Sequence, residues 1–341
     1  MFETVLVADR GPAARRVVRT CEHLGARTVV VHTPHDRDAP AVRAADEAVP
    51  IGGSGWADSY GDPQKVLEAA QRTGAEAVHP GAGPLAEDAR LARVVLDAGL
   101  AWLGLPPEAL ERTDQQTAAL ARSLGLAPAT AGRRLVVTTL DGTVLGVREQ
   151  VRRDDGAPLY DRQPPDLPGD VLAQAEHAAL VVARAAGAGR LTAVGLTVAG
   201  DAAGVAAVLP VLLLGSAATE EAAGIDLVEV QLRLACDETL PVPGRRRHAL
   251  ALHLRAADRF AGRVRRWAVP AVSERDDVRV DAGVGKGVRL SLASDRTLAV
   301  ITVTADDEAA LRGAARGVVD EIVVEGVPTS LPALREALAH P

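Results

Sequence analysis

Lysine is almost absent from this sequence: of 38 basic residues only Lys65 and Lys286 are lysines, and arginine supplies the rest. A mechanism that places several lysines along a phosphate chain is therefore excluded. Cysteine is equally scarce, because Cys21 and Cys236 are the only two and their separation matches no metal-binding spacing. We expect both to be reduced and structural. Aromatic residues make up only 2% of the chain, which argues against stacking platforms for nucleic-acid bases.

The charge and hydropathy of the chain narrow the class of protein further. A formal net charge of −7 argues against general nucleic-acid binding. No run approaches the roughly 20 apolar residues of a membrane-spanning helix, and the opening Met1–Thr4 lacks the basic flank of a secretory signal. We therefore expect a cytoplasmic protein with neither nucleic-acid nor membrane partners. Its 341 residues suffice for two domains, or for one domain with a large appendage.

The N-terminal part of the chain alternates short apolar strands with helices. Strands are predicted at Thr4–Ala8, Arg27–His32, Glu76–His79 and Ala101–Leu103, and helices at Ala13–Leu24, Pro63–Thr73 and Leu85–Ala98. This alternation predicts a doubly wound parallel sheet with helices on both faces. The connection at 80–84, with sequence Pro-Gly-Ala-Gly-Pro, lies between a strand and a helix start, where ligands bind in such sheets. A plain tight turn is the alternative interpretation.

The stretch from 191 to 235 has a different pattern. Two runs with strand character, Leu191–Ala199 and Val205–Leu214, flank a hairpin turn at 200–204. The second run carries no polar side chain, which is typical of a strand buried on both faces. One continuous helix is predicted over Thr219–Ala235, with Thr219 and Glu220 at its start, where acidic groups meet the positive end of the helix dipole.

The remaining elements make the C-terminal half α+β. Further strands are predicted at Arg134–Leu140, Val144–Glu149, His248–Leu254 and Thr297–Val303, and further helices within Pro106–Leu124 and at Val171–Ala186, Asp306–Asp320 and Ser330–Ala339. Asp141-Gly142 joins the first two of these strands and is a good hairpin signal. The charged, proline-rich segment Arg152–Gly169 is predicted to be a loop and is the clearest linker in the chain.

Several segments resemble the biotin carboxylases of the ATP-grasp superfamily. The segments of this chain that are similar to family motifs, in order along the sequence, are VLVADRG at 5–11, DRDA at 36–39 with VRAADEA at 42–48, HPGAGPLAED at 79–88, GIDL at 224–227 with QLR at 231–233, VRVDAG at 278–283 and VEGVPT at 324–329. Both order and spacing hold over roughly 1–130 and 215–341. The resemblance implies an N-terminal α/β domain over 1–130, a remnant of the ATP-grasp domain without its lid over 131–235, and a biotin carboxylase C-terminal-like domain over 236–341.

The departures from the family pattern decide what function the resemblance implies. Family members have a lid subdomain with a glycine-rich loop and a lysine over the ATP phosphates, whereas here Gly132-Arg133-Arg134 runs almost directly into a strand, and the family GDK segment is Asp114-Gln115-Gln116. Counted back from Gly224, the family's two magnesium-binding glutamates and neighbouring asparagine fall on Gly195, Ala207 and Leu209. Its bicarbonate-handling arginine and glutamate fall on Val211 and Gly215. The arginine that holds the biotin enolate falls on His253, and the tyrosine of the glycine-rich connection on Ala82.

These losses predict a protein that cannot make carboxyphosphate. Mg²⁺ needs oxygen ligands, and phosphoryl transfer depends on metal and cation positioning. We expect no ATP or metal cofactor and a catalytically inactive relative of biotin carboxylase, a pseudoenzyme that acts as a scaffold, regulatory or ligand-binding subunit. One alternative is an enzyme that reuses the cleft for ATP-independent chemistry on an apolar or carboxylated small molecule. Another is residual ATP-linked activity, or activity completed by a partner subunit.

Eight residues are candidates for the cleft or for ligand binding: Asp9, Arg10, His79, Glu87, His248, His253, Leu212 and Leu213. Each also has a purely structural interpretation, for example His79 as a satisfied strand-end residue and His253 as a half-buried strand residue. The space left by the lid and the acids is expected to be either a collapsed core or an apolar pocket near His253 and 212–214. A homodimer is also expected, because the resemblance places the helix Ala13–Leu24, with Arg15, Arg16, Arg19 and Glu22, at a dimer face.

Overall fold

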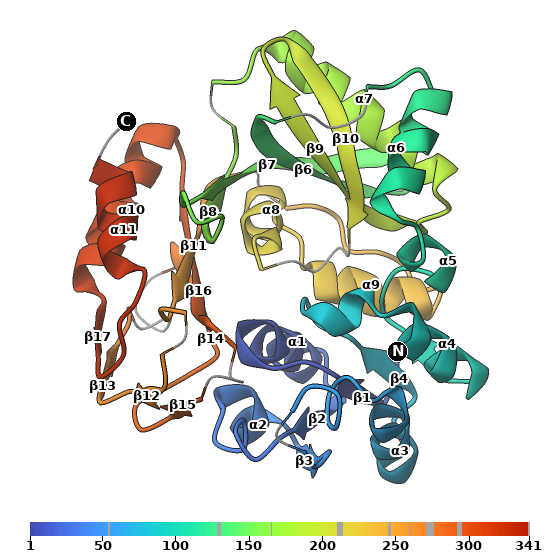
Figure 1. The fold of residues 1–341 in the computed structure, drawn as a ribbon, viewed down its shortest axis with the longest axis vertical. Helices are drawn as coiled ribbons and strands as arrows, with labels where there is room; N and C mark the ends of the chain where they lie inside the picture. Colours follow the sequence, from blue (N-terminus) through green and yellow to red (C-terminus); the bar gives the residue numbers. More distant parts are fainter. Residues whose placement is uncertain are drawn as a thin grey trace.

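The computed structural model describes residues 1–53, 55–127, 131–164, 166–209, 214–244, 247–258, 260–270, 276–291 and 295–339. Figure 1 shows two sheets: a parallel sheet formed by the N-terminal part of the chain and a larger antiparallel sheet formed by the rest, with helices between them and around them. No helix in the described ranges is long and apolar enough to cross a membrane.

The N-terminal sheet has five parallel strands in the order β3-β2-β1-β4-β5. Their bounds are β1 Thr4–Val7, β2 Arg27–His32, β3 Glu47–Pro50, β4 Ala77–His79 and β5 Ala101–Trp102. Because the strands are apolar on both sides, the sheet needs cover on both faces. Helices α3 (Pro63–Thr73) and α4 (Ala89–Asp97) pack on one face, and α1 (Gly11–His23) packs on the other. The predicted doubly wound parallel sheet is confirmed.

Shorter elements complete this part of the chain. They are α2 (Pro40–Ala44), the 3₁₀ turn η1 (Pro84–Glu87), α5 (Pro107–Leu110) and α6 (Asp114–Ser123). The single helix predicted over Leu85–Ala98 is thus a 3₁₀ turn followed by α4. The break falls at Asp88, whose carboxylate accepts hydrogen bonds from the N–H groups of Arg90 and Leu91 and so begins the new helix.

The second sheet has eight antiparallel strands in the order β10-β9-β6-β7-β8-β11-β16-β14. Their bounds are β6 Arg133–Leu140, β7 Thr143–Arg152, β8 Pro158–Arg162, β9 Leu191–Ala199, β10 Ala202–Leu209, β11 His248–Arg255, β14 Val278–Ala282 and β16 Thr297–Ala305. The prediction of a loop or linker over Arg152–Gly169 is wrong, because β8 lies inside it and pairs with both β7 and β11. The hairpin turn is also tighter than predicted, since β10 begins at Ala202.

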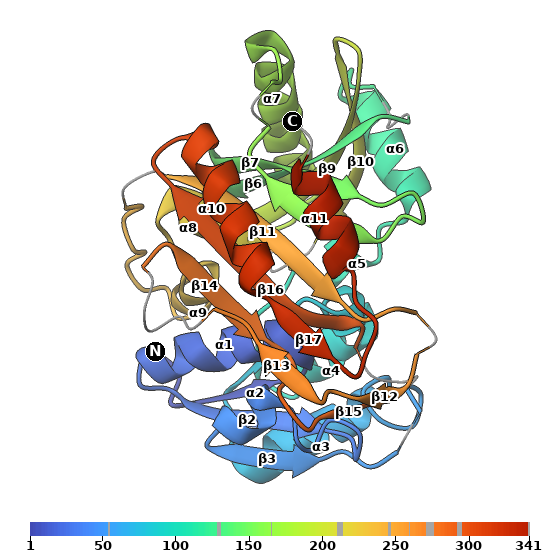
Figure 2. The same ribbon diagram turned by 90° about the vertical axis from the view of Figure 1, so that its left-hand side faces the viewer.

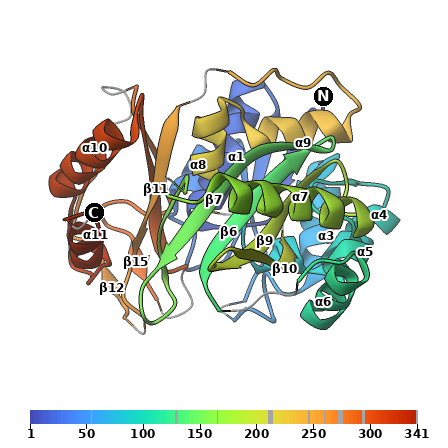
Figure 3. The same ribbon diagram turned by 90° about the horizontal axis from the view of Figure 1, so that it is seen from above.

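Helices cover the outer face of this sheet. Helix α7 (Gly169–Ala185) packs on β6, β9 and β10, while α10 (Glu308–Glu321) and α11 (Leu331–Ala339) pack on β11 and β16 (Figures 2 and 3). Alternation along β11 separates the two faces: Leu250, Leu252 and Leu254 face α10 and α11, and Ala249 and Ala251 face inward. Two small pairs, β12 (Gly262–Arg263) with β15 (Arg289–Leu290) and β13 (Arg266–Ala268) with β17 (Val323–Glu325), flank the C-terminal end.

The helix predicted over Thr219–Ala235 is two helices, α8 (Ser216–Ala223) and α9 (Leu227–Ala235). Gly224 ends α8 in the left-handed conformation with φ of 62°, and the Asp226 carboxylate caps the first N–H groups of α9. Helix α8 lies against the inner face of the antiparallel sheet, and α9 packs against the parallel sheet beside α1. The segment therefore joins the two sheets (Figure 1).

Candidate functional site

A cleft of about 320 Å³ lies between the two sheets, and we refer to it as the central cleft. The inner face of the antiparallel sheet forms most of its wall through β6, β7, β9, β10 and β11. The N-terminal part of the chain contributes Ala82 and Glu87 from the connection after β4, and the segment after β10 contributes Leu214 and Gly215. The cleft therefore opens at the carboxyl ends of the parallel strands, where ligands bind in sheets of this kind.

The cleft contains the positions at which the family resemblance placed a catalytic centre. Those positions are Ala82, Gly195, Ala207, Leu209, Gly215 and His253, and all six line it. Val211, the position of the bicarbonate arginine, lies outside the described residues, as do Leu212 and Leu213. Residues far apart in the sequence thus meet at one site, as the motif spacing predicted.

The space that the missing acids would need is filled from within the chain. A Cβ atom at Gly195 would lie 3.1 Å from Leu209 Cδ1, so the leucine covers that position. A Cβ atom at Gly215 would overlap the carboxylate of Asp161, which comes from β8. The position assigned to a glutamate is thus occupied by a different acid on a different strand.

Asp161 is the centre of a buried chain of charged groups that sequence reasoning missed. Its Oδ2 atom is 2.7 Å from His253 Nε2, and Arg148 Nη1 donates to its Oδ1 atom at 3.1 Å. The three side chains are at most 2% exposed. Burial works to raise the pKa of Asp161, but the Arg148 guanidinium and the hydrogen bond with His253 outweigh it and hold that pKa below its usual value. Asp161 is therefore a carboxylate.

Polar atoms at both ends of this chain have no partner among the described residues. They are Nδ1 of His253 and Nε and Nη2 of Arg148. His253 lines the central cleft, whereas Arg148 borders a second cavity of about 250 Å³ beside α7 and α8. Buried polar atoms in folded proteins are nearly always hydrogen-bonded, to protein or to bound molecules. At the His253 end, a residue that lines the cleft thus has one buried ring nitrogen without a partner among the described residues.

Two further arginines, Arg134 and Arg152, line the cleft. Arg152 donates to Gln150 Oε1 at 2.8 Å and to the carbonyl oxygen of Gly156 at 2.7 Å, which fixes its side chain. Within the part of the chain that the structure describes, neither arginine forms an ion pair with an acid. Partial burial lowers the pKa of Arg152, and the nearby Arg134 cation lowers it further. The cleft therefore has a positive wall, opposed by the exposed carboxylate of Glu87.

The residues of the cleft do not fit Mg²⁺ and ATP. A magnesium site needs carboxylate or other oxygen ligands, and Glu87 is the only acid among the described lining residues. Among the described residues, no group of three or more histidine, cysteine or acidic side chains could hold a metal ion. Neither Lys65 nor Lys286 lines the cleft.

Asp9 and Arg10 lie near the cleft but do not line it. Asp9 is buried beneath the connection after β4, where its carboxylate accepts hydrogen bonds from the N–H groups of Ala82 and Arg10, both at 2.8 Å. Burial raises the pKa of Asp9 to about 7 despite these hydrogen bonds. The Arg10 guanidinium lies over the ring of Tyr60, 5.3 Å from its centroid. Asp9 thus holds the loop that carries Ala82, and Arg10 faces a different neighbour.

The two other histidine candidates are also absent from the cleft wall. His79 is fully buried: its Nδ1 accepts from the N–H of Gly81 at 3.0 Å, and Nε2 is 3.3 Å from Gln231 Oε1. Burial lowers its pKa to about 4, so the ring is neutral at neutral pH. His248 begins β11 at the far end of the strand, where its Nδ1 atom lies 3.9 Å from Glu308. Of the six candidates that the structure describes, Glu87 and His253 line the cleft.

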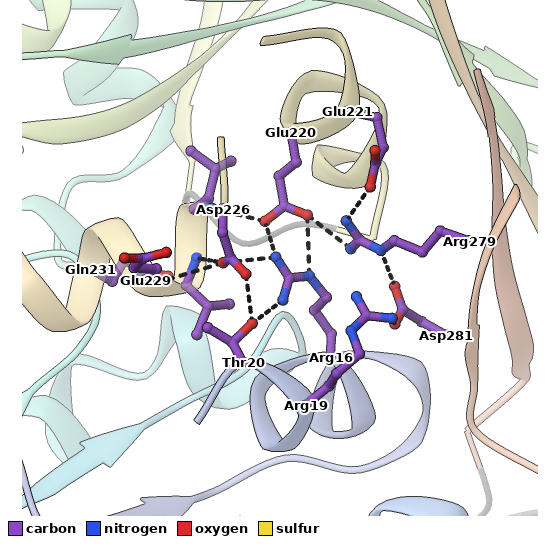
Figure 4. Close-up of polar contacts among 12 residues, drawn as sticks. Arg16, Arg19, Thr20, Glu220, Glu221, Asp226, Glu229, Gln231, Arg279 and Asp281 are labelled. Carbon is purple, nitrogen blue, oxygen red and sulfur yellow. Dashed lines mark hydrogen bonds and ion pairs between the residues drawn. The ribbon is translucent and has the colours of Figure 1, made fainter. Parts of the chain in front are cut away.

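A second set of buried charges, shown in Figure 4, connects the two sheets, and we name it the inter-sheet network. Arg16 of α1 donates to Glu220 of α8 at 2.7 and 3.1 Å, and its Nη2 lies 2.8 Å from Asp226. Arg279 of β14 approaches the same Glu220 carboxylate at 2.8 Å and bonds Asp281 at 2.9 Å. Glu220, predicted as a helix-start residue, is instead 2% exposed in the middle of this network.

The inter-sheet network includes two arginines of α1, the helix that we expected at a dimer face. Arg16 is buried and faces inward, and Arg19 bonds Asp281 at 2.7 Å. Two of the four charged residues on which that expectation rested thus make contacts inside the chain, while Glu22 is exposed.

Comparison with known protein families shows to which family this architecture belongs. The sequence model of the biotin carboxylase N-terminal domain matches residues 1–110, and that of the biotin carboxylase C-terminal domain matches residues 258–341. The chain belongs to the biotin carboxylase family. The solved biotin carboxylase domain of a single-chain bacterial carboxylase is 29% identical with a TM-score of 0.90, over 99% of this chain and 93% of that one. The strands β6 to β11, which lie between the two matched segments, thus belong to the family fold.

Curated relatives are similar over different lengths. A biotin carboxylase of Halalkalibacterium halodurans is 26% identical over an alignment that spans the whole chain and 95% of that protein. The biotin-dependent acyl-coenzyme A carboxylase alpha3 subunit of Mycobacterium leprae is 42% identical over 42% of this chain, but only 24% of that subunit is covered. A solved single-chain, multi-domain long-chain acyl-CoA carboxylase is 27% identical with a TM-score of 0.89, and 41% of it is covered.

Proposed function

We propose that this member of the biotin carboxylase family does not carboxylate biotin and acts as a ligand-binding or regulatory subunit, a pseudoenzyme. The observation that carries the proposal is the composition of the central cleft. At the positions where the resemblance places metal-binding side chains it has Gly195, Ala207 and Leu209, and Leu209 covers Gly195.

The chemistry of phosphoryl transfer explains why these replacements matter. Catalysis of this reaction consists almost entirely of positioning and charge stabilisation by metal ions and cations. The cleft supplies arginines but one acid, and that acid, Glu87, is exposed on the opposite side from the strands. Without an acid to hold a divalent cation, the residues present cannot assemble the usual nucleotide site.

The proposal predicts that the protein does not bind Mg-ATP. Isothermal titration calorimetry of the full chain with Mg-ATP should show no saturable heat at millimolar nucleotide, while the H. halodurans biotin carboxylase, measured in parallel, serves as the positive control. Micromolar binding to this chain would overturn the proposal.

A second function, ATP-independent chemistry in the same cleft, is favoured by one observation. The Asp161–His253 pair resembles the orienting acid and base of many enzymes, because the acid bonds one ring nitrogen and leaves the other without a partner. Native mass spectrometry of the purified protein would distinguish the two functions. Recovery of one unaltered small molecule favours a binding subunit, whereas conversion of that molecule on incubation favours an enzyme.

A carboxylase-type protein partner and a homodimer form the last part of the proposal. Support for a partner comes from the relatives, whose names include an acyl-coenzyme A carboxylase subunit and a multi-domain carboxylase. Closed two-fold assemblies are the commonest oligomers, which supports a dimer. Multi-angle light scattering over a wide concentration range should give the mass of two chains. A monomer at every concentration would contradict this prediction.

A further inference from the structure

We propose that the central cleft binds a small carboxylic acid with an apolar body, its carboxylate held by Arg134 and Arg152 next to His253. This inference rests on the proposed function, because it requires a cleft that does not take Mg-ATP. Arg134 and Arg152 are not among the positions that the resemblance assigns to nucleotide, metal, bicarbonate or biotin.

The charge of the cleft argues for an anion. The whole chain carries a net charge of −7, yet two arginines that lack an acidic partner among the described residues lie on one wall of this cleft. The acids of β7 and of the adjacent β8 are already paired, Glu149 with Arg133 and Arg162, and Asp161 with Arg148. A guanidinium group binds a carboxylate through two parallel hydrogen bonds, so an anionic ligand would neutralise this wall.

The shape and remaining lining argue for an apolar body of modest size. Leu196, Ala207, Leu209 and Leu214 line the cleft beside the arginines. Its volume of about 320 Å³ is at the lower end of the roughly 300–1,000 Å³ typical of small-molecule sites. Apolar walls with a few placed polar groups fit a short aliphatic acid and disfavour a highly charged polyphosphate.

His253 lies beside the carboxylate site. Because the Asp161 carboxylate can only accept a hydrogen bond, Nε2 of His253 donates to it, and Nδ1 has no partner among the described residues. The charged groups around the ring are Asp161 and Arg148 beneath it and Arg134, Arg152 and Glu87 around the cleft.

The test uses hexanoate as the probe and hexanamide as its uncharged control, in calorimetric titrations of the full chain. Hexanoate should bind, and hexanamide should bind at least about tenfold more weakly, since a hydrogen bond between charged groups is worth that much. Arg152→Gln and Arg134→Gln should each weaken hexanoate binding by at least about tenfold. Arg153→Gln, the exposed neighbour that pairs with Asp155, is the matched control and should leave affinity within about twofold.

Equal binding of hexanamide, unchanged affinity in both arginine variants, or no hexanoate binding to the wild type would overturn the proposal. These failures differ from failure of the proposed function, whose signature is Mg-ATP binding. If hexanoate fails and Mg-ATP also fails, the proposed function stands and this inference falls.

Discussion

Asp9 and His79 are two buried titratable residues that hold the connection after β4 from opposite sides. Asp9 accepts the Ala82 N–H, and His79 accepts the Gly81 N–H. Burial raises the pKa of Asp9 to about 7 and lowers that of His79 to about 4, so both residues favour their neutral forms in the folded protein. Their contributions to stability therefore change in opposite directions across the same pH range.

The raised pKa of Asp9 predicts a pH-dependent effect of Asp9→Asn. Between about pH 4 and pH 7 the unfolded chain has lost the Asp9 proton while the folded protein keeps it, so this residue makes the protein less stable as pH rises, up to the folded pKa. Asparagine cannot ionise, which removes that loss, but it has one acceptor oxygen where Asp9 accepts two N–H groups on two oxygens. The variant should therefore be less stable than the wild type near pH 4, and its free energy of unfolding relative to the wild type should rise by about 1–3 kcal/mol between pH 4 and pH 8.

Urea unfolding at pH 4.5, 6 and 8 measures this difference. Asp97→Asn, a change at an exposed position on α4, is the control and should stay within about 0.5 kcal/mol of the wild type at each pH. A difference between Asp9→Asn and the wild type that stays constant or falls from pH 4.5 to pH 8 would show that ionisation of Asp9 does not destabilise the folded protein.

At the scale of elements, local sequence was enough to predict the bounds of a helix or strand where residues at or near its ends determine where it begins and stops. Helix α3 was predicted with its observed bounds because Asp62 caps its start, Pro63 fits its first turn and Gly74 ends it in the left-handed conformation. Strand β2 was predicted equally well, since the three consecutive valines at its buried centre, 29–31, form one apolar run. The spacing of family motifs also placed Gly195, Ala207, Gly215 and His253 at one cleft, where they are found.

Strand β8 and its Asp161 could not be predicted in the same way. The segment around it is charged and rich in proline, and β8 has only five residues. Its stability comes from pairing with β7 on one side and with β11, some 90 residues later, on the other. The β-prone pair Leu159-Tyr160 was the one local signal. Without this strand, neither the anchor of His253 nor the pairing of Arg148 was visible in the sequence.

The break between α8 and α9 was missed because apolar periodicity continues across it. Gly224 makes the break necessary in two ways: its φ is 62°, and a Cβ atom there would lie 2.9 Å from the Cα of Gly244. Gly74 shares the first property, with φ of 67°, but a Cβ atom there would meet nothing within 4 Å. Substitution of Gly74 therefore measures the free-energy cost of the left-handed backbone alone, and substitution of Gly224 measures that cost together with the cost of steric overlap.

Alanine substitution at these two glycines should cost different amounts. Gly74→Ala should lower the free energy of unfolding by about 1–2 kcal/mol, because only the left-handed conformation is penalised. Gly224→Ala should lower it by about 2–5 kcal/mol, because overpacking against a backbone segment adds to the same penalty. Guanidinium unfolding of both variants measures the difference, and equal losses would show that the Gly244 segment moves aside freely.

At the scale of the whole molecule, the inter-sheet network joins three regions that are distant in sequence. Glu220 of α8 bonds Arg16 of α1 and Arg279 of β14, and it also accepts the N–H of Leu227 at the start of α9. Apolar contacts of α1 with Val228 and Leu232 of α9 extend the same junction. Because charges and apolar side chains are buried together across the junction, the two sheets should unfold as one cooperative unit.

Glu220→Gln tests this coupling. The change removes the carboxylate that the buried guanidinium groups of Arg16 and Arg279 share, while Arg16 keeps Asp226 and Arg279 keeps Asp281. The loss of charged hydrogen bonds should lower the free energy of unfolding by about 1.5–3 kcal/mol. The matched control is Glu111→Gln, which breaks the exposed pair with Arg93 and should cost less than about 1 kcal/mol.

Denaturant unfolding of single-tryptophan proteins that keep either Trp102 or Trp267 reports on the parallel sheet and on the C-terminal region separately. With Glu220 in place, the two single-tryptophan proteins should unfold at the same denaturant midpoint, and Glu220→Gln should lower both midpoints by the same amount. Different midpoints with Glu220 in place would show that the network does not couple the two sheets.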